Sequence, residues 1–194
     1  MDSKIDIRKI ALDWNLSDLP AELPSQYYCA TRDIFQARLD NMVNDLLVSK
    51  KIGDGNAYMI SAIAGEIGNN SFDHNIGSWP DVAGIFFGYQ FAGDILSVVL
   101  ADRGLGIRAT LSRIKPGIVD DQEALKVAFF ERISGRAPES RGNGLKFVRE
   151  NIKERNMHLK FVSGDAQILA NQETEIKPFG QKIHGCLAII DLKI

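Results

Sequence analysis

The chain has 194 residues, of which 45% are hydrophobic and 25% are charged, and its formal net charge is −2. This composition is typical of a water-soluble globular domain whose core forms without disulfides or metals. It excludes a basic nucleic-acid-binding protein, and the lack of a long apolar run or a signal-peptide core predicts a cytoplasmic protein without a membrane partner. The cysteines, Cys29 and Cys186, lack metal-ligand spacing, so reduced thiols are expected.

The first half of the chain predicts two helices and a hairpin after an N-terminal segment, residues 1–30. Residues 3–12 alternate weakly between polar and apolar and predict a strand, a candidate edge strand of the domain. Helical spacing of apolar residues then predicts helices from Thr31 to about Lys50 and from about Asp54 to His74. Apolar, β-branched and aromatic residues at 82–90 and 94–102 predict a hairpin whose second strand ends at Asp102.

The second half alternates glycine-rich segments with helices and closes with strands. Residues 103–121 are rich in glycine and turn signals, and 122–133 predict a helix. Another glycine-rich run precedes a helix at 145–156, and strands are predicted at 157–164, 166–171 and 185–194. Because strands and helices are segregated in the chain, we predict an α+β fold, a two-layer sandwich with helices on one face of a mixed, mostly antiparallel sheet.

The stretch AGEIGNNSFDHN, residues 64–75, places unusual polar residues inside the second helix. Asn, Asp and Ser disfavour helices because their side chains compete for backbone hydrogen bonds. At 3.6 residues per turn, one face carries polar side chains and the opposite face suits a core. The polar face consists of Glu66, Asn70, Asp73 and His74, and the core face of Ile60, Ile63, Ala64, Ile67 and Ser71. A solvated surface and a ligand-binding face both fit this pattern.

Two glycine-containing motifs follow this helix. In ADRGLGI, Asp102 ends an apolar strand, and Gly104 and Gly106 allow the backbone to turn close to a ligand. In SRGNGLKFV, Gly142 and Gly144 precede a helix whose free N–H groups suit an anion. Each motif alone also fits an ordinary turn or helix start. The second is neither a P-loop nor a dinucleotide fingerprint.

Taken together and in this order, EIGNNSFDH, DRGLG and RGNGL resemble the three nucleotide-binding boxes of the GHKL ATPase superfamily. That superfamily includes DNA gyrase, sensor histidine kinases and anti-sigma-factor serine kinases. The resemblance covers residues 31–194 and implies the histidine-kinase-like ATPase domain, or Bergerat fold, with an ATP lid at about 107–141. The segment 1–30 lies outside it.

The resemblance implies a role for each matching residue. Asn70 matches the asparagine that coordinates Mg²⁺, and Glu66 matches the general base of the members that hydrolyse ATP. Asp73 and His74 match flanking positions near the nucleotide, and Asp102 matches the carboxylate that binds the adenine amino group. The remaining matches form the adenine pocket, Gly104 and Gly106, and the phosphate-wrapping box, Gly142, Gly144 and Leu145.

The resemblance therefore implies an Mg²⁺-dependent ATP-binding protein that hydrolyses ATP or transfers its phosphate to a Ser or Thr of a partner protein. A small regulatory partner of the STAS type is the expected acceptor, as for the anti-sigma-factor kinases. The alternative is a non-catalytic, nucleotide-gated module that binds proteins in a regulatory pathway. Two departures from the family pattern are Cys186, where a threonine is common, and Lys146, where sensor kinases carry a glycine.

Overall fold

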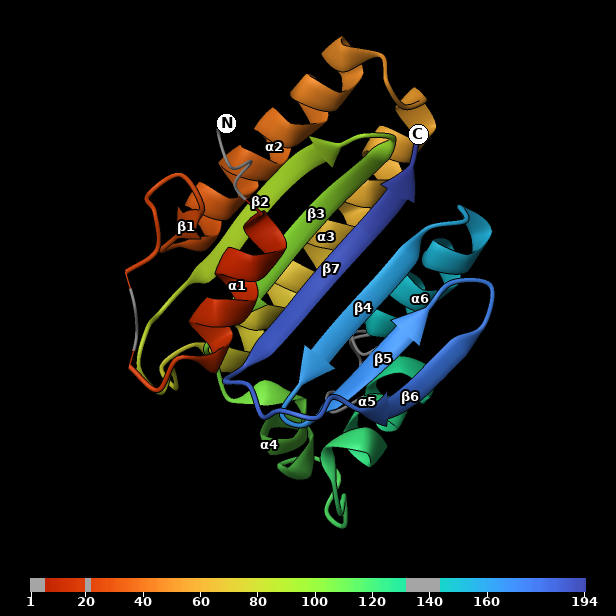
Figure 1. Ribbon diagram of the computed structural model, residues 1–194. Coiled ribbons are helices and arrows are strands. Elements are labelled where there is room, and N and C mark those ends of the chain that lie inside the picture. The colour runs from red at the N-terminus through yellow and green to blue at the C-terminus, as the bar shows by residue number, and fades with distance from the viewer. Residues whose placement is uncertain (1–5, 20–21, 132–143) are drawn as a thin grey trace, which may run out of the picture.

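The computed structural model describes residues 6–19, 22–131 and 144–194, which form one sheet with helices on both of its faces (Figure 1). In these ranges the helices are α1 (Ile7–Leu16), α2 (Arg32–Ser49), α3 (Asp54–Asn75), α4 (Gly106–Ser112), α5 (Asp121–Phe130) and α6 (Gly144–Glu154). The strands are β1 (Tyr28–Cys29), β2 (Ile85–Ala92), β3 (Ile95–Asp102), β4 (His158–Ser163), β5 (Ala166–Ala170), β6 (Thr174–Pro178) and β7 (Cys186–Lys193).

The sheet has the order β1-β2-β3-β7-β4-β5-β6, so the last strand of the chain lies at its centre. Every pairing between described strands is antiparallel, and the parallel component expected of a mixed sheet is not present among them. The predicted α+β sandwich is confirmed, but its helices cover both faces of the sheet and not one, because α1 packs on the second face. None of the described helices combines the length and apolar composition needed to cross a bilayer.

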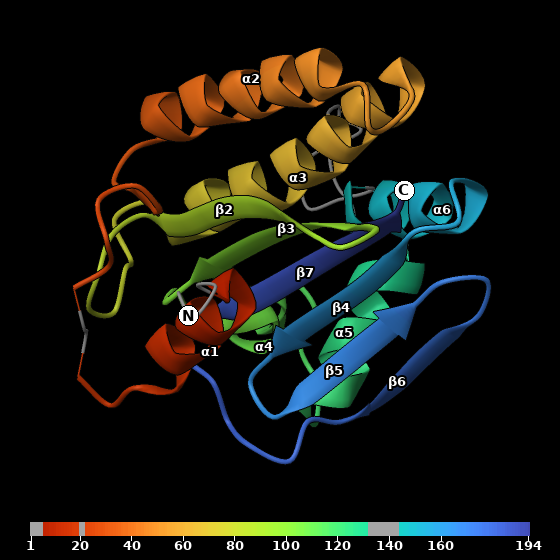
Figure 2. The ribbon, with the colours of Figure 1, turned by 45° about the horizontal axis from the view of Figure 1, so that its top comes forward.

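The main helical layer consists of α2, α3, α5 and α6 on one face of the sheet (Figures 1 and 2). Two glycines of α3 allow α2 to approach closely, because a Cβ at Gly68 would lie 2.3 Å from the Phe35 ring and one at Gly65 would lie 3.2 Å from Leu39. Phe129 of α5 packs edge-on against Phe161 of β4 at 5.3 Å between ring centroids. The predicted lid therefore contains a helix that belongs to the core.

The strand predicted at residues 3–12 is wrong, because residues 7–16 form α1 on the opposite face of the sheet (Figure 1). The buried residues of α1, Ile7, Ala11, Trp14 and Asn15, recur at helical spacing, and Asp6 caps its first turn by accepting from Arg8 N–H at 3.0 Å. The weak alternation in a short segment was compatible with either structure. The edge strand within residues 1–30 is β1, which pairs with β2.

Two further elements were not predicted from the sequence. Residues 106–112, expected in a glycine-rich turn segment, form the short helix α4, and β6 was not predicted. β6 is an edge strand with only partly buried or exposed residues, so it lacks the apolar run that marks a buried strand. α4 stands at the end of β3 and thereby closes one side of the site described next.

Candidate functional site

Asp102 is the last residue of β3 and lies at the centre of the site. Side chains alternate along a strand, so Leu100 and Asp102 face the α2–α3 layer, whereas Ala101 faces α1. Asp102 is 2% exposed. Its Oδ2 accepts from the Ser71 hydroxyl at 2.7 Å and its Oδ1 from the Gly104 N–H at 2.8 Å. A carboxylate has about four acceptor positions, so it can accept further hydrogen bonds from a ligand.

Burial raises the pKa of Asp102, and the hydrogen bonds from Ser71 and from the backbone of Gly104 and Cys186 oppose that shift. Cys186 pairs with Asp102 across the β3–β7 ladder. Burial also raises the pKa of the Cys186 thiol well above its ordinary value, and the charge of Asp102 adds to the effect. The site therefore combines a desolvated carboxyl group with a neutral thiol.

Gly185 allows β7 to begin directly against Asp102. Its φ is +63°, and a Cβ there would lie 2.1 Å from the Asp102 carbonyl oxygen, so only glycine fits. Ser163 of β4 lies on the other side of this strand start, where its hydroxyl accepts from Ile107 N–H at 2.9 Å and lies 3.6 Å from Cys186 Sγ. This serine thus joins the first turn of α4 to the sheet.

The polar face of α3 extends from Glu66 to His74. Asn70 Nδ2 donates to Glu66 Oε1 at 3.3 Å, which leaves the amide oxygen of Asn70 as a possible acceptor or metal ligand. Partial burial lowers the pKa of His74, and the neighbouring Asp73 carboxylate opposes this shift. Asp73 itself forms an ion pair with Arg32 of α2 at the surface and does not line the cavity that Asn70 and His74 line.

Asn75, the last residue of α3, holds the turn that follows β3. Its Nδ2 donates to the Ser71 carbonyl at 2.7 Å, and its Oδ1 accepts from Leu105 N–H at 2.8 Å. A Cβ at Gly104 would lie 2.2 Å from Asn75 Nδ2, so this glycine is required by close packing. Gly106 has φ +76° and begins α4. Because Gly104 has no side chain, the turn after β3 can pack directly against α3.

A cavity of about 40 Å³ lies between these elements. Ligand pockets usually measure about 300–1,000 Å³, so this cavity is far too small for a nucleotide in the described conformation. Its polar side is formed by Asn70, Ser71, His74 and Asp102, and its apolar side by Ile67, Ile107, Leu145 and Phe161.

The start of α6 lies against the carboxylate of Glu66. A Cβ at Gly144 would lie 1.7 Å from Glu66 Oε1, so glycine is required for this approach. A helix N-terminus carries partial positive charge and favours an anion beside it. Leu145, the next residue, lines the cavity. Gly142, the other glycine predicted here, lies outside the described residues, as do residues 132–141 of the predicted lid.

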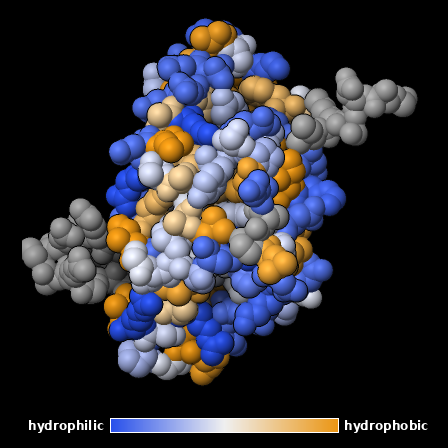
Figure 3. Space-filling view, turned by 90° about the vertical axis from the view of Figure 1, so that its left-hand side faces the viewer, coloured by the Kyte–Doolittle hydropathy of each residue, from blue (hydrophilic) through white to orange (hydrophobic). Residues whose placement is uncertain are grey.

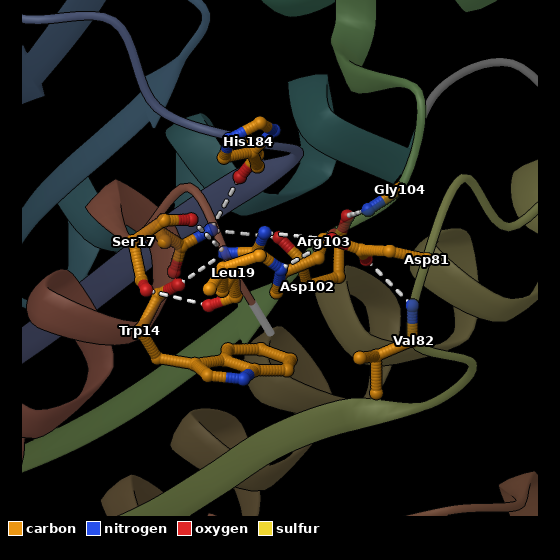
Figure 4. A network of polar contacts seen from close by, with 10 residues as sticks. Trp14, Ser17, Leu19, Asp81, Val82, Asp102, Arg103, Gly104 and His184 are labelled. Carbon is orange, nitrogen blue, oxygen red and sulfur yellow. Dashed lines mark hydrogen bonds and ion pairs between the residues drawn. The ribbon is translucent and has the colours of Figure 1, made fainter. Parts of the chain in front are cut away.

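Two side chains join α1 to the end of β3, and Figure 4 shows one of them, Arg103, with Asp81 and Trp14. Asn15 is fully buried, and its Nδ2 donates to the carbonyls of Asp102 and His184 at 2.7 and 2.5 Å. The side chain of Arg103 is 0% exposed and donates through Nε and Nη2 to Asp81 Oδ2 at 2.8 and 2.6 Å. Its Nη1 donates to the carbonyls of Trp14 and Ser17. The end of β3 is therefore held from both faces.

The structure brings Glu66, Asn70 and His74 together on one helix face with Asp102, Gly104, Gly106, Gly144 and Leu145 around them. Other contributors were not predicted from the sequence, and Ser71, which was expected on the core face, binds Asp102. Asn75 and Arg103 lie within the quoted motifs, so the sequence already placed them near the predicted site. Asn15 and Gly185 gave no signal, because their importance depends on contacts distant in sequence.

Both cysteines should be unreactive in the folded protein. Burial raises the pKa of Cys29 to about 11 and that of Cys186 well above its ordinary value, whereas the thiolate is the reactive species. We expect iodoacetamide at pH 8 to leave both thiols unmodified while glutathione in the same sample is fully alkylated. Mass spectrometry before and after unfolding in guanidinium measures this, and rapid labelling of either thiol in the native protein would contradict it.

No protein-family model matches this chain, and no curated protein matches it. In residues 6–19, 22–131 and 144–194, no cluster of three or more His, Cys, Asp and Glu side chains is placed to hold a metal ion. The amide oxygen of Asn70 in the cavity wall is one of the oxygen ligands that suit a hard cation such as Mg²⁺.

Proposed function

We propose that this protein is an Mg²⁺-dependent ATP-binding protein of the GHKL type that hydrolyses ATP or transfers its terminal phosphate to a partner protein. The observation that carries the proposal is the buried carboxyl group of Asp102 in the wall of a cavity whose other polar wall is the Asn70–His74 face of α3. Adenine has an exocyclic amine that can donate a hydrogen bond to a carboxylate, whereas guanine has a carbonyl oxygen at the equivalent position.

The residues at the other end of the site suit the phosphates and their metal ion. The amide oxygen of Asn70, which has no hydrogen-bond donor among the described residues, is a ligand type that Mg²⁺ accepts, and Mg²⁺ usually takes few protein ligands beside substrate phosphates. Glu66 lies one helical turn before Asn70, in position for a general base. The N-terminus of α6 at Gly144 supplies backbone N–H groups for an anion.

Nucleotide binding requires the site to open, because the cavity of about 40 Å³ holds little more than a water molecule. α4 and the start of α6 contribute Ile107 and Leu145 to its apolar side, so we propose that these two elements move apart. Phe129 of α5 is buried in the main core. We therefore restrict the proposed lid to parts of residues 107–141 outside α5.

A Ser or Thr of a small STAS-like protein is the proposed phosphate acceptor, and a cytoplasmic location agrees with a supply of Mg²⁺-ATP. The alternative is a non-catalytic module in which nucleotide controls protein binding. The two differ in whether bound ATP is converted to ADP. Titration calorimetry with ATP, with and without Mg²⁺, measures binding. A phosphate assay in the same sample detects hydrolysis, and transfer of the terminal phosphate to an added STAS-type protein detects the kinase.

We expect Asp102→Asn to weaken ATP binding about 10–100-fold, since a hydrogen bond to a charged group contributes about 1.5–3 kcal/mol. GTP binding should weaken less, because an amide can donate to the guanine carbonyl. Calorimetry with both nucleotides measures the effect, and circular dichroism checks that the variant folds. Asp94→Asn, an exposed change in the β2–β3 turn, is the control. Unchanged ATP affinity in folded Asp102→Asn would overturn the assignment of the pocket.

A further inference from the structure

The outer edge of β2 is only partly covered by β1. β1 pairs with Ile85 and Phe86, and Phe87 N–H donates to the Tyr27 carbonyl at 2.8 Å. The chain then turns away, since Tyr27 N–H donates to Pro24. Among the described residues no strand pairs with this edge beyond Phe87. Residues 88–92 therefore form an open strand edge about 17 Å long at 3.4 Å per residue.

The open edge offers backbone hydrogen-bonding groups in a regular pattern. In an antiparallel ladder, the N–H and C=O of alternate residues point to the same side of the strand. Phe87 donates toward the β1 side, so the backbone groups of Tyr89 and Phe91 point to that side as well. Within the described part of the chain, neither residue has a backbone partner there. This edge is a template for one more strand.

A groove of about 550 Å³ lies between α2 and the start of this edge, at Gly88 and Tyr89. Figure 3 shows the corresponding face, on which hydrophobic and hydrophilic residues are interspersed. Phe87 and Tyr89 form one wall, and Arg38, Asn41, Asn44 and Asp45 of α2 form the other. Gln26 and Tyr27 also line the groove. Asp45 accepts from the Tyr89 hydroxyl at 2.5 Å, which ties the two walls together. The exposed amides of Asn41 and Asn44 remain available to an incoming chain.

We propose that this groove binds an extended segment of a partner protein, which adds to the sheet as a strand beside residues 88–92. Such β-strand addition obtains affinity from main-chain hydrogen bonds and specificity from alternate side chains. The partner residues opposite Tyr89 and Phe91 point toward α2, where β-branched or aromatic side chains with a hydroxyl can contact the rings and the Asn amides.

The charge near this edge and the position of α2 further restrict which kind of partner can bind. Lys51 Nζ lies 4.4 Å from the Phe91 ring centroid and places a positive charge at that end of the edge, which favours an acidic residue in the partner. A second copy paired through its own β2 fits poorly. In a two-fold antiparallel pairing of two β2 strands, both α2 helices would lie on the same face of the joined sheet. Each α2 already runs along the outer side of its own β2, so the two helices would compete for the same space (Figures 1 and 2).

The test uses synthetic heptapeptides with Thr, Val, Tyr or Glu at each position, screened against the full chain by fluorescence polarisation. We expect the best peptide to bind at or below roughly millimolar concentration and to slow hydrogen exchange at the Tyr89 and Phe91 amides. No binding at that concentration, or protection confined to other residues, would overturn the proposal. Sedimentation measures whether the chain forms dimers. If it does, and if exchange of the Tyr89 and Phe91 amides is slowed in the dimer, a second copy of the chain occupies this edge and the proposal of a partner peptide is overturned.

Two matched comparisons sharpen this test. N-methylation of alternate peptide residues gives two isomers, and the one methylated on the side that faces β2 should bind roughly tenfold or more weakly, while the other retains affinity. Asn41→Trp should fill the groove and abolish binding, whereas Asp40→Trp, at the neighbouring exposed position of α2, should not. Equal losses in both members of either pair would contradict strand addition in this groove.

Discussion

We expect Glu66→Gln to preserve Mg²⁺-ATP affinity and to slow ATP turnover about 10²–10⁴-fold, the range typical of general acid–base catalysis. Glu66 Oε1 lies 3.3 Å from Asn70 Nδ2, and its carboxylate contacts the start of α6. A carboxylate can take the proton of an attacking water or hydroxyl, whereas an amide cannot. Glutamine keeps the size of the side chain and can still accept from Asn70, so binding and folding should be maintained.

The measurement combines calorimetric ATP affinity with single-turnover phosphate release. Asp54→Asn is the matched control, because Asp54 lies in the first turn of the same helix and pairs only at the surface with Lys50, at 3.8 Å. Equal turnover in Glu66→Gln and wild type would exclude Glu66 as the base. Loss of affinity together with turnover would assign Glu66 to ligand binding, and a wild type that binds ATP without hydrolysis or phosphotransfer would favour the non-catalytic alternative.

The second large effect concerns stability. We expect Arg103→Ala to lower the free energy of unfolding by about 2–4 kcal/mol, because a buried carbonyl that loses its donor costs about 1–3 kcal/mol and Arg103 binds two carbonyls as well as Asp81. The side chain is 0% exposed and binds Asp81 and two carbonyls at the end of α1. Its removal leaves these acceptors unpaired. For a domain of this size the melting temperature should fall by roughly 4–16 °C, and hydrogen exchange in α1 should accelerate first.

Arg8→Ala is the control for this prediction. Arg8 also joins α1 to the sheet, through Asp191 at 2.7 Å, but its side chain is 36% exposed, so we expect a loss of about 1 kcal/mol or less. Denaturant unfolding of both variants measures the difference. Equal losses would contradict the special role of Arg103, and an unchanged α1 exchange rate would contradict its role in anchoring the helix.

The pH dependence of unfolding gives a second readout of the same pair. Partial burial raises the pKa of Asp81, but the hydrogen bonds from Arg103 and from Val82 N–H, together with the positive charges of Arg103 and His184, lower it more, and the net shift is downward. A carboxyl group with a lowered pKa in the folded state stabilises the protein above its unfolded-state pKa, and loses that contribution as pH falls through the folded-state value. The stability difference between wild type and Asp81→Asn should therefore be present at neutral pH and disappear in acid.

Local patterns in the sequence determined much of the framework. Helical periodicity and hairpin composition correctly predicted α2, α3, β2 and β3, and they located Asp102 at the end of a strand. The same periodicity placed Glu66, Asn70 and His74 on one face of α3, where the structure has them. These features follow from repeating burial along one element, which is visible without knowledge of its neighbours. The nucleotide-binding roles assigned to these residues remain predictions.

Only the tertiary structure decided how separate elements complete the site. It placed α1 where a strand was expected, directed Asp73 to Arg32, and brought Asn15 to the Asp102 carbonyl across 87 positions of sequence. The packing of these elements also sets the cavity volume at about 40 Å³ and leaves the β2 edge open beside α2. Such features depend on which surfaces pack together, and packing joins residues whose spacing along the chain carries no periodic signal.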